Sequence, residues 1–258
     1  MTDSTPSISV CIIAKNAMPR IKDTLESVKW ADEIVVLDSG STDDTVAVSK
    51  EYTKHVYQTD WPGFGVQFQR AMDKGSSDWL LSVDADEVVT PELKQEILDA
   101  IRGAGAGVDA FAMPRRSHLC NTRIFHSSWY PDYVPRVFRR GAVRYTTDLV
   151  HPRPVVSGAL RKLRSDLLHY PYDTVDALQE KAAFYSTLWA EDKYSKGKRA
   201  SLRLALGKAL WTFIRVWVIR RGFLDGRYGF IIAMALAGGT WSKYMKLACK
   251  SRECEHRS

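Results

Sequence analysis

Two acidic motifs each follow an apolar run, and their spacing suits a phosphorylated ligand. Asp84-Ala-Asp86 follows the run Trp79–Val83, and Asp38 ends the run Glu33–Asp38. Alternate residues just past a strand can aim two carboxylates at one point, and a hard divalent cation on a diphosphate takes such oxygen ligands. Asp38 can accept a hydrogen bond from a nucleobase or a ribose hydroxyl. An acidic turn that caps the next helix would carry the same residue types.

The elements that must position these motifs alternate between strand and helix. Strands are predicted at Ile8–Ile13, Glu33–Asp38, His55–Tyr57 and Trp79–Asp84. Helices are predicted from Pro19 to Val28, after a cap at Thr42 or Asp43, from Gly65 through Met72, and from Pro91 to Ile101. This alternation favours a mainly parallel sheet with helices on both faces, in which ligands bind beyond the carboxyl ends of the strands.

Composition is that of a globular protein of 258 residues, with 45% hydrophobic and 26% charged residues. The cysteines at positions 11, 120, 249 and 254 form no CxxC pair, which favours a reduced cytosolic compartment. The polar opening segment does not resemble a signal peptide. The apolar stretches Leu202–Ile219 and Tyr228–Trp241 are too interrupted or too short to predict a membrane span. The sequence carries no motif that predicts an oligomeric state.

After about residue 110 the pattern changes to short strands and loops, and from about Val175 it becomes helical and basic. Basic residues alternate there with Leu, Ile, Phe and Trp, at positions 196, 198, 199, 203, 208, 215, 220, 221 and 227. Such helices can lie in the headgroup layer of an anionic membrane, which also suits the net charge of +7. The alternative is a helical subdomain that packs on the catalytic core or on another subunit.

The segment Ile8–Asn16, the turn Asp38–Asp43 and Asp84-Ala-Asp86 together resemble family 2 glycosyltransferases of the GT-A fold, in order and in spacing. Three further segments are similar to lipopolysaccharide core glucosyltransferases of that family: Trp61–Gly65, Trp129–Asp132 with Arg136–Arg140, and Gly222–Gly226. The resemblance implies an α/β GT-A nucleotide-diphospho-sugar transferase fold, with a mostly parallel central sheet flanked by helices and a basic helical C-terminal extension. It implies a catalytic domain over residues 1–172, with a nucleotide-sugar half to about 110 and an acceptor half over 111–172, and a helical region over 173–258.

The resemblance also implies site residues. Those expected at the nucleotide sugar are Ala14, Asn16, Asp38, Gln69, Arg70 and Asp84. Asp86 and His151 are expected to hold a divalent metal, Mn or Mg, on the diphosphate, with His169 as a further candidate. The alternative for Gln69 and Arg70 is a solvated helix face, and the alternative for either histidine is a structural role. Pro152 stands where relatives often carry an acidic residue after the histidine.

Asp132 is the candidate general base, because an inverting transferase needs a carboxylate to take the proton of the acceptor hydroxyl. The resemblance places it four residues before Arg136, although Pro131 stands where many relatives have Glu. The alternative is a simple ion pair with Arg136 or Arg139. The residues expected at the acceptor are Trp129, Tyr130, Arg136 and Arg139, and Arg115 and Arg116 could join them in clamping an acidic group.

The expected function is metal-dependent, inverting transfer of a hexose, glucose from UDP-glucose, to an inner-core heptose of lipopolysaccharide or a similar lipid-linked glycan. A polyprenyl phosphate or another glycan is the alternative acceptor. A nucleotidyltransferase would need a Gly-rich loop where Ala14–Arg20 stands, and a nucleic-acid-binding module would need basic and aromatic residues in place of the acidic motifs. The expected location is the cytoplasm, at the periphery of the inner face of the plasma membrane, with no nucleic-acid partner.

Overall fold

The computed structural model describes residues 6–146 and 153–255, with side chains up to Ser251. The chain folds into two compact units. The first unit contains the chain up to Arg115 together with residues 132–170, and the second contains residues 116–131 together with the chain from Pro171 onward. The chain therefore enters the second unit twice.

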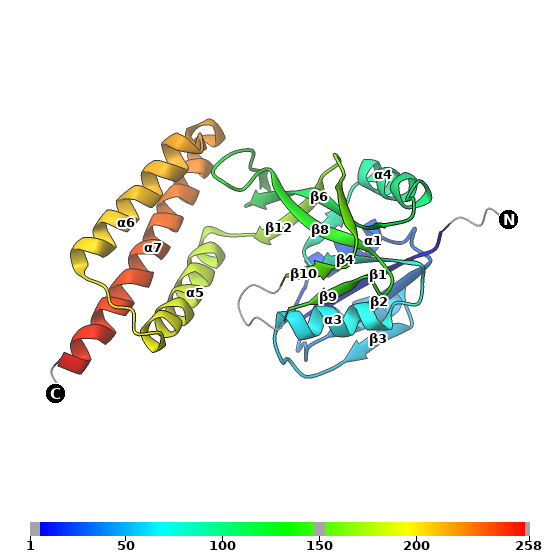
Figure 1. Cartoon of the computed structure of the whole chain (residues 1–258), viewed down its shortest axis with the longest axis horizontal. Helices are drawn as coiled ribbons and strands as arrows, with labels where there is room; N and C mark the ends of the chain where they lie inside the picture. Colours follow the sequence, from blue (N-terminus) through cyan, green and yellow to red (C-terminus); the bar gives the residue numbers. More distant parts are fainter. Residues whose placement is uncertain (1–5, 147–152, 256–258) are drawn as a thin grey trace. The chain divides into compact units, whose positions relative to one another are not determined.

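A ten-stranded sheet begins with four parallel strands, in the order β3-β2-β1-β4. Their bounds are Ile8–Ala14 for β1, Glu33–Asp38 for β2, His55–Gln58 for β3 and Trp79–Asp84 for β4. Ala14 pairs with Asp38, and Ile13 pairs with Asp84, so β2, β1 and β4 end at one edge. The predicted α/β architecture is confirmed (Figure 1). Asp38 and Asp84, the last residues of β2 and β4, lie at the same carboxyl edge.

Further strands continue the sheet in the order β4-β8-β6-β12-β5, with β8 antiparallel to both β4 and β6, and β12 antiparallel to β5. They are β8 (Asp132–Arg139), β6 (Val108–Leu119), β12 (Leu167–Tyr172) and the short β5 (Glu87–Val89), and β7 (Thr122–Arg123) and β11 (Ala159–Lys162) pair with β6. A separate two-stranded sheet joins β9 (Val143–Tyr145) and β10 (Pro154–Val156). The antiparallel strands bring residues from the second half of the chain to the end of β4.

Helices cover both faces of the parallel strands, because alternate residues of each strand are apolar on opposite sides. Ile8, Val10 and Ile12 share one core with residues of α1 (Arg20–Ser27) and α4 (Pro91–Arg102). Cys11 and Ile13 share a second core with residues of α3 (Phe64–Lys74). α2 (Thr45–Tyr52) adds Val48 and Tyr52 to the rim of the first core. α4 begins as predicted at Pro91, after Thr90 accepts the Leu93 N–H at 3.1 Å.

The second unit is built on three long helices, α5 (Val175–Ser195), α6 (Leu202–Ile214) and α7 (Gly226–Glu255). A π-helical turn η1 (Arg215–Ile219) and a 3-10 turn η2 (Gly222–Asp225) connect α6 with α7 (Figure 1). Leu178, Val216 and Ile232 form its core, which Leu119 and Ile124 of the first inserted segment complete. Within the described part of the chain, no helix combines the length and apolarity needed to cross a membrane.

Candidate active site

The turn after β2 is shaped by its own first residue. Asp38 is fully buried, and its Oδ2 accepts hydrogen bonds from the N–H groups of Gly40 and Ser41, both at 3.0 Å. Gly40 has φ 82°, a backbone conformation that favours glycine. The Asp38 carboxylate therefore orders the turn from inside the protein.

The loop after β1 is fastened to this turn. Asn16 Oδ1 accepts the Thr42 N–H at 2.7 Å, and the Asn16 N–H donates to Ser41 Oγ at 2.8 Å. Asp43 accepts the N–H of Thr45 at 3.1 Å and that of Met18 at 3.1 Å, but the N-cap position of α2 is Asp44, one residue beyond the predicted caps. Hydrogen bonds, the one with Thr45 first, hold the pKa of Asp43 below its ordinary value. The loops beyond β1 and β2 thus form one connected wall at the carboxyl edge.

One face of α3 contacts the same turn through a residue that the sequence did not single out. Gln67 is buried, and its Nε2 donates to Ser39 Oγ at 2.8 Å and to Thr59 Oγ1 at 2.7 Å. Arg70, three residues further, donates to Gln67 Oε1 at 3.3 Å and to Asp60 Oδ1 at 2.6 Å. Gln67 and Arg70 lie three residues apart and therefore share a helix face. That spacing is the feature of the sequence that could have identified Gln67 as a site residue.

Gln69 lies on another face of α3. Its Oε1 accepts the Tyr145 N–H at 3.0 Å, and its Nε2 donates to Asp73 at 2.7 Å. Gln69 is therefore engaged with β9 and with its own helix, whereas Arg70 belongs to the face that contacts the turn after β2.

The acidic motif forms a tight turn between β4 and β5, and Thr24 Oγ1 fastens it by donating to Ala85 O at 3.0 Å. β12 runs antiparallel to β5 and pairs His169 with Glu87. This register brings His169 Nε2 to 3.7 Å from Asp86 Oδ2, so the second candidate histidine lies beside the motif. His151 falls outside the described residues.

The donor atoms of this turn suit a cation that takes its other ligands from a diphosphate. Asp84 Oδ1 is buried and has no hydrogen-bond partner among the described residues. Asp86 is about one-third exposed, and His169 adds a nitrogen donor next to it. The described residues contain no cluster of three or more His, Cys, Asp or Glu arranged for a metal ion. Phosphate oxygens would be needed to complete the coordination of a hard cation.

Arg136 lies between two carboxyl groups behind the acidic turn. Its Nη2 is 2.5 Å from Asp84 Oδ2 and 2.6 Å from Glu87 Oε1, and the residue is 7% exposed. Burial alone would lower the pKa of the Arg136 guanidinium, but Asp84 and Glu87 raise it above its ordinary value. Burial also raises the pKa of Glu87 to about 7, against the lowering effect of Arg136. Arg136, expected at the acceptor, is thus directed into the protein.

Asp132 begins β8 at the same edge of the sheet. β8 runs antiparallel to β4 with Leu81 opposite Val137, so its first residues extend past the end of β4. Arg115 of β6 pairs with Asp132 and donates to its Oδ2, from Nη2 at 2.7 Å and from Nε at 3.1 Å. The Asp132 side chain is 43% exposed. The predicted base therefore has one oxygen held by Arg115 and is open to solvent.

Arg139 lies at the opposite end of β8. It pairs with Trp79, the first residue of β4, whereas Asp84 is the last. Its guanidinium contacts Asp109 Oδ1 at 3.3 Å and lies 4.6 Å from the centre of the Trp79 ring. The structure therefore does not bring Arg139 together with the acidic turn.

Trp129 and Tyr130 belong to the second unit, in a loop held by Asp225. The Asp225 carboxylate accepts the N–H groups of Phe125 and His126, both at 3.0 Å, and the hydroxyl of Ser127 at 2.9 Å. Its side chain is only 3% exposed. The motif Gly222–Gly226 thus has a structural task, which is to fasten the loop that carries the two aromatic residues.

Those aromatic residues have partners within the same unit. The Trp129 ring lies 5.8 Å from that of Tyr172, and the Arg116 guanidinium lies 4.9 Å from the centre of the Tyr130 ring. Arg116, one of the predicted clamp residues, thus stacks on an expected acceptor residue, whereas Arg115 contacts Asp132.

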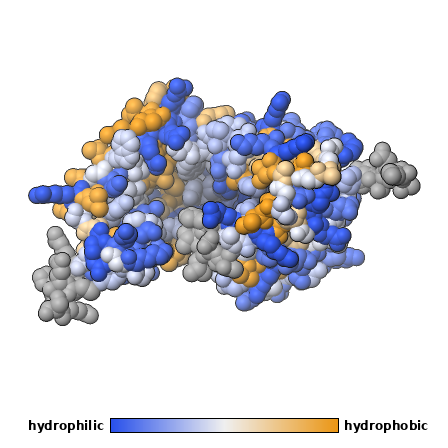
Figure 2. Space-filling model, viewed as in Figure 1, coloured by the Kyte–Doolittle hydropathy of each residue, from blue (hydrophilic) through white to orange (hydrophobic). Residues whose placement is uncertain are grey.

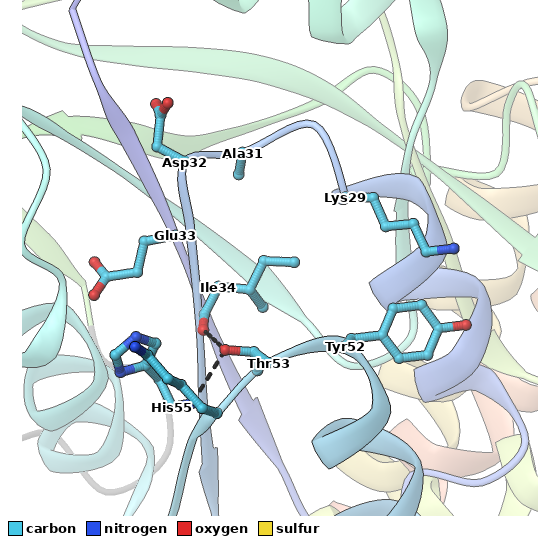
Figure 3. A pocket seen from close by; sticks show the side chains of 9 residues that line it. Lys29, Ala31, Asp32, Glu33, Ile34, Tyr52, Thr53 and His55 are labelled. Atoms are coloured by element: carbon cyan, nitrogen blue, oxygen red, sulfur yellow. Dashed lines mark hydrogen bonds between the residues drawn. The ribbon is translucent and has the colours of Figure 1, made fainter.

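A pocket opens at the other end of the parallel strands, lined by Lys29, Glu33, Tyr52 and His55 among others (Figure 3). Its acidic side chains accept hydrogen bonds from backbone N–H groups of the protein. Glu33 accepts the Ser76 N–H at 2.7 Å, and Asp32 accepts the Ile8 N–H at 2.8 Å. The dashed lines in Figure 3 mark the hydrogen bonds that join Thr53 to Ile34 and His55. The pocket is therefore separate from the candidate site, which lies at the carboxyl edge.

Comparisons with known proteins find sequence relatives among glycosyltransferases. An "Uncharacterized glycosyltransferase" of Rickettsia felis is 31% identical over 95% of this chain and 89% of its own length. The "Lipopolysaccharide core biosynthesis glycosyltransferase LpsC" of Rhizobium meliloti is 29% identical over 88% of this chain and 86% of its own.

Among solved structures, glucosyl-3-phosphoglycerate synthase from Mycobacterium tuberculosis is 26% identical over 43% of this chain and 44% of its own, with a TM-score of 0.39. That structure was solved with Mn²⁺, UDP-glucose and phosphoglyceric acid. The sequence model described as "Glycosyl transferase family 2" matches residues 9–167, more than half of the chain. The chain therefore belongs to glycosyltransferase family 2, whose GT-A fold its first unit adopts.

Proposed function

We propose that the protein transfers glucose from UDP-glucose to an inner-core heptose of lipopolysaccharide, or to a similar lipid-linked glycan, with inversion at the anomeric carbon. The acceptor hydroxyl gives its proton to Asp132 while its oxygen attacks the anomeric carbon. The bond between that carbon and the diphosphate oxygen breaks, and UDP leaves with the bonding electrons. The proton on Asp132 then passes to solvent, because that side chain is 43% exposed.

The observation that carries this proposal is the position of Asp84, Asp86 and Asp132 at one edge of the sheet. Asp84 and Asp86 form the turn after β4, and β8 begins with Asp132 beyond the end of β4. One carboxylate pair at a diphosphate and a third carboxylate at the acceptor are what an inverting transfer requires. The donor-binding role is proposed for residues at the ends of β1, β2 and β4 and on α3, namely Ala14, Asn16, Asp38, Arg70 and Asp84, whereas Gln69 contacts β9 and Asp73.

A divalent cation, Mn²⁺ or Mg²⁺, suits the oxygen donors of the acidic turn. Asp86 would hold it, together with His169 or the predicted ligand His151, and diphosphate oxygens would supply the remaining ligands. When bound, such a cation offsets negative charge on the leaving diphosphate. The unpartnered, buried Asp84 Oδ1 supports this assignment, because a buried carboxylate oxygen usually has a partner.

The acceptor assignment comes from the resemblance to lipopolysaccharide core glucosyltransferases, and the similarity to LpsC supports it. Trp129 and Tyr130 remain the proposed acceptor residues, whereas Arg136 is directed into the protein and Arg139 lies at the far end of β8. Both aromatic residues lie in a loop that Asp225 fixes. A polyprenyl phosphate is the second candidate acceptor.

The second unit is proposed to contact the inner face of an anionic membrane from the cytoplasm. Large apolar side chains are exposed along α6 and the two turns that follow it, among them Leu206, Leu210 and Trp211, which are 54–60% exposed. Figure 2 shows hydrophobic residues gathered over α6. Residues 196–224 contain Lys and Arg but no Asp or Glu. An apolar ridge with basic neighbours fits anionic headgroups over an acyl layer.

The proposal is tested by transfer of labelled glucose to lipopolysaccharide that ends at its inner-core heptose. UDP-glucose, UDP-galactose and UDP-N-acetylglucosamine are compared as donors, with Mn²⁺ or Mg²⁺ present or removed by a chelator. Metal-dependent transfer from UDP-glucose supports the proposal. Transfer to a polyprenyl phosphate but not to lipopolysaccharide would show that the alternative acceptor is the correct one. Strong RNA binding without any use of nucleotide sugars would exclude the proposed function.

A further inference from the structure

Glu87 touches both halves of the candidate site without reaching the surface. It is fully buried, and its Oε1 lies 2.6 Å from Arg136 Nη2 and 3.6 Å from Arg115 Nη1. Its Oε2 accepts the N–H of Asp84 at 2.9 Å. One carboxyl group therefore contacts two guanidinium groups and the backbone of the acidic turn.

Each of the two arginines also contacts a second carboxyl group, which belongs to a residue of the candidate active site. Arg136 contacts Asp84 Oδ2 at 2.5 Å, and Arg115 contacts Asp132 Oδ2 at 2.7 Å. The result is a chain of side chains across β4, β5, β6 and β8, in the order Asp84–Arg136–Glu87–Arg115–Asp132. We call this chain the ion chain.

Exposure rises from the middle of the ion chain to its ends. The side chains of Glu87 and Arg136 are 0% and 8% exposed, whereas those of Asp84 and Asp132 are 26% and 43% exposed. Asp84 is thus held through the buried Arg136, and Asp132 through Arg115, whose side chain is 24% exposed.

Stability alone does not account for this arrangement. Removing charged groups from water costs several kcal/mol per ion, so well-packed apolar residues could often replace them without loss. The strands are already joined by their backbone ladders, β4 with β8 and β6 with β8. What an apolar core could not do is fix the directions of two carboxylates at the edge of the sheet.

We propose that Glu87 is a positioning residue, which acts through Arg136 and Arg115 to hold the Asp84 and Asp132 carboxylates in fixed directions relative to each other. The inference rests on the proposed function, in which Asp84 binds the donor and Asp132 takes the acceptor proton. Glu87 itself touches neither substrate. Its loss therefore affects the transfer step more than the binding of UDP-glucose.

The test compares Glu87→Gln with Asp109→Asn. Asp109 is a matched control, because it pairs with Arg139 across the same two strands, β6 and β8, away from the ion chain. In Glu87→Gln an amide NH2 group replaces one carboxyl oxygen. This hydrogen-bond donor then faces other donors, either the guanidinium groups of Arg136 and Arg115 or the N–H of Asp84. We expect kcat for transfer to fall about 10- to 100-fold, with KM for UDP-glucose within about threefold of the native value. Asp109→Asn is expected to keep kcat within about threefold, with a smaller loss of thermal stability because its ion pair is partly exposed.

Glu87→Asp serves as a second variant if Glu87→Gln does not fold. It keeps the carboxyl group but shortens the side chain by one methylene, so it cannot contact both arginines at the observed distances. The same decrease in kcat is expected with a smaller loss of stability. A folded variant with native kcat, or a decrease equal to that of Asp109→Asn, would overturn the positioning role.

Crystal structures of the same variants separate this inference from the proposed function. We expect the Asp132 carboxylate to leave its position beside Arg115, or Asp84 to leave Arg136, while the backbone of β4 and β8 stays in place. If both carboxylates keep their native positions, the positioning role is excluded. Absence of transfer by the native protein would instead exclude the proposed function, and the crystal structures would still decide the role of Glu87.

Discussion

Arg115 binds Asp132 through two nitrogens, Nη2 at 2.7 Å and Nε at 3.1 Å, and both bonds go to the same carboxylate oxygen, Oδ2. The Asp132 side chain is otherwise 43% exposed. A carboxylate held in this way keeps a fixed orientation at the sheet edge while one side remains accessible. This is the geometry expected of a base that receives a proton from a bound hydroxyl.

Asp132→Asn should abolish most transfer without weakening donor binding. The amide keeps the size of the side chain and an oxygen for Arg115, but it cannot accept the proton. We expect kcat to fall about 10²- to 10⁴-fold, with Kd for UDP-glucose changed less than about threefold. Transfer rates and calorimetric binding are measured in parallel, with Asp109→Asn as the control. Transfer within about threefold of the native rate would exclude Asp132 as the base.

Asp225→Ala should loosen the loop that carries Trp129 and Tyr130. The substitution leaves the N–H groups of Phe125 and His126 and the hydroxyl of Ser127 without their acceptor. We expect the free energy of unfolding to fall by about 1–3 kcal/mol, and amide exchange at Phe125 and His126 to accelerate. Glu180→Ala, an exposed change on α5, is the control. Unchanged exchange at the two amides would contradict the assigned role of Asp225.

The contribution of Glu96 to stability should depend on pH. Glu96 accepts the N–H groups of Arg164 at 2.8 Å and Ser165 at 2.7 Å. Burial raises the pKa of Glu96, but the hydrogen bonds from Ser165 and Arg164 outweigh that effect and lower it below its ordinary value. A lowered pKa in the folded state gives stability that is present above the ordinary pKa of 4.5 and is lost as the pH falls through the folded-state pKa.

Urea unfolding of the native protein and of Glu96→Gln checks this expectation. The native protein should be more stable by about 1 kcal/mol at neutral pH, and the difference should shrink below about pH 4.5. Gln95→Ala, on an exposed side of the same helix, controls for helix effects. A difference that grows as the pH falls has the wrong sign and would contradict the assignment.

Leu210→Gln combined with Trp211→Gln should weaken binding to vesicles of phosphatidylethanolamine and phosphatidylglycerol. Both side chains are exposed on α6, at 58% and 54%, and inserting each into the acyl layer is worth about 1.5–3 kcal/mol. We expect a loss of at least about tenfold in vesicle affinity. Phe184→Gln is the matched control, because Phe184 is 61% exposed on α5. Equal losses in both variants, or native binding by the double variant, would exclude α6 as the contact.

Much of the first unit could be predicted from local patterns. Ile8–Ile13 and Trp79–Asp84 are short apolar runs bounded by turn residues, and each forms a buried strand in the structure. The parallel register follows from the helices between the strands, so the shared edge of Asp38 and Asp84 could be anticipated.

The ion chain and the hydrogen bonds from residues 125–127 to Asp225 could not be predicted, because they depend on pairing between distant segments. Glu87 looks like part of an acidic turn until β6 and β8 place Arg115 and Arg136 against it. Asp225 is 98 residues from Ser127, and no local pattern connects them. Arg139 was expected at the acceptor, and only the antiparallel register of β8 with β4 puts it at the far end of the strand.

The most direct test of the central claim is calorimetric titration of UDP-glucose in the presence of Mn²⁺, comparing the native protein with Asp86→Ala. Asp44→Ala is the matched control, because Asp44 is an exposed acidic residue at the same edge of the sheet and its side chain makes no capping hydrogen bond. We expect metal-dependent binding by the native protein and by Asp44→Ala, and a loss of at least about tenfold in Asp86→Ala. Absence of nucleotide-sugar binding, or equal binding by all three proteins, would contradict the assignment of this edge as a nucleotide-sugar site.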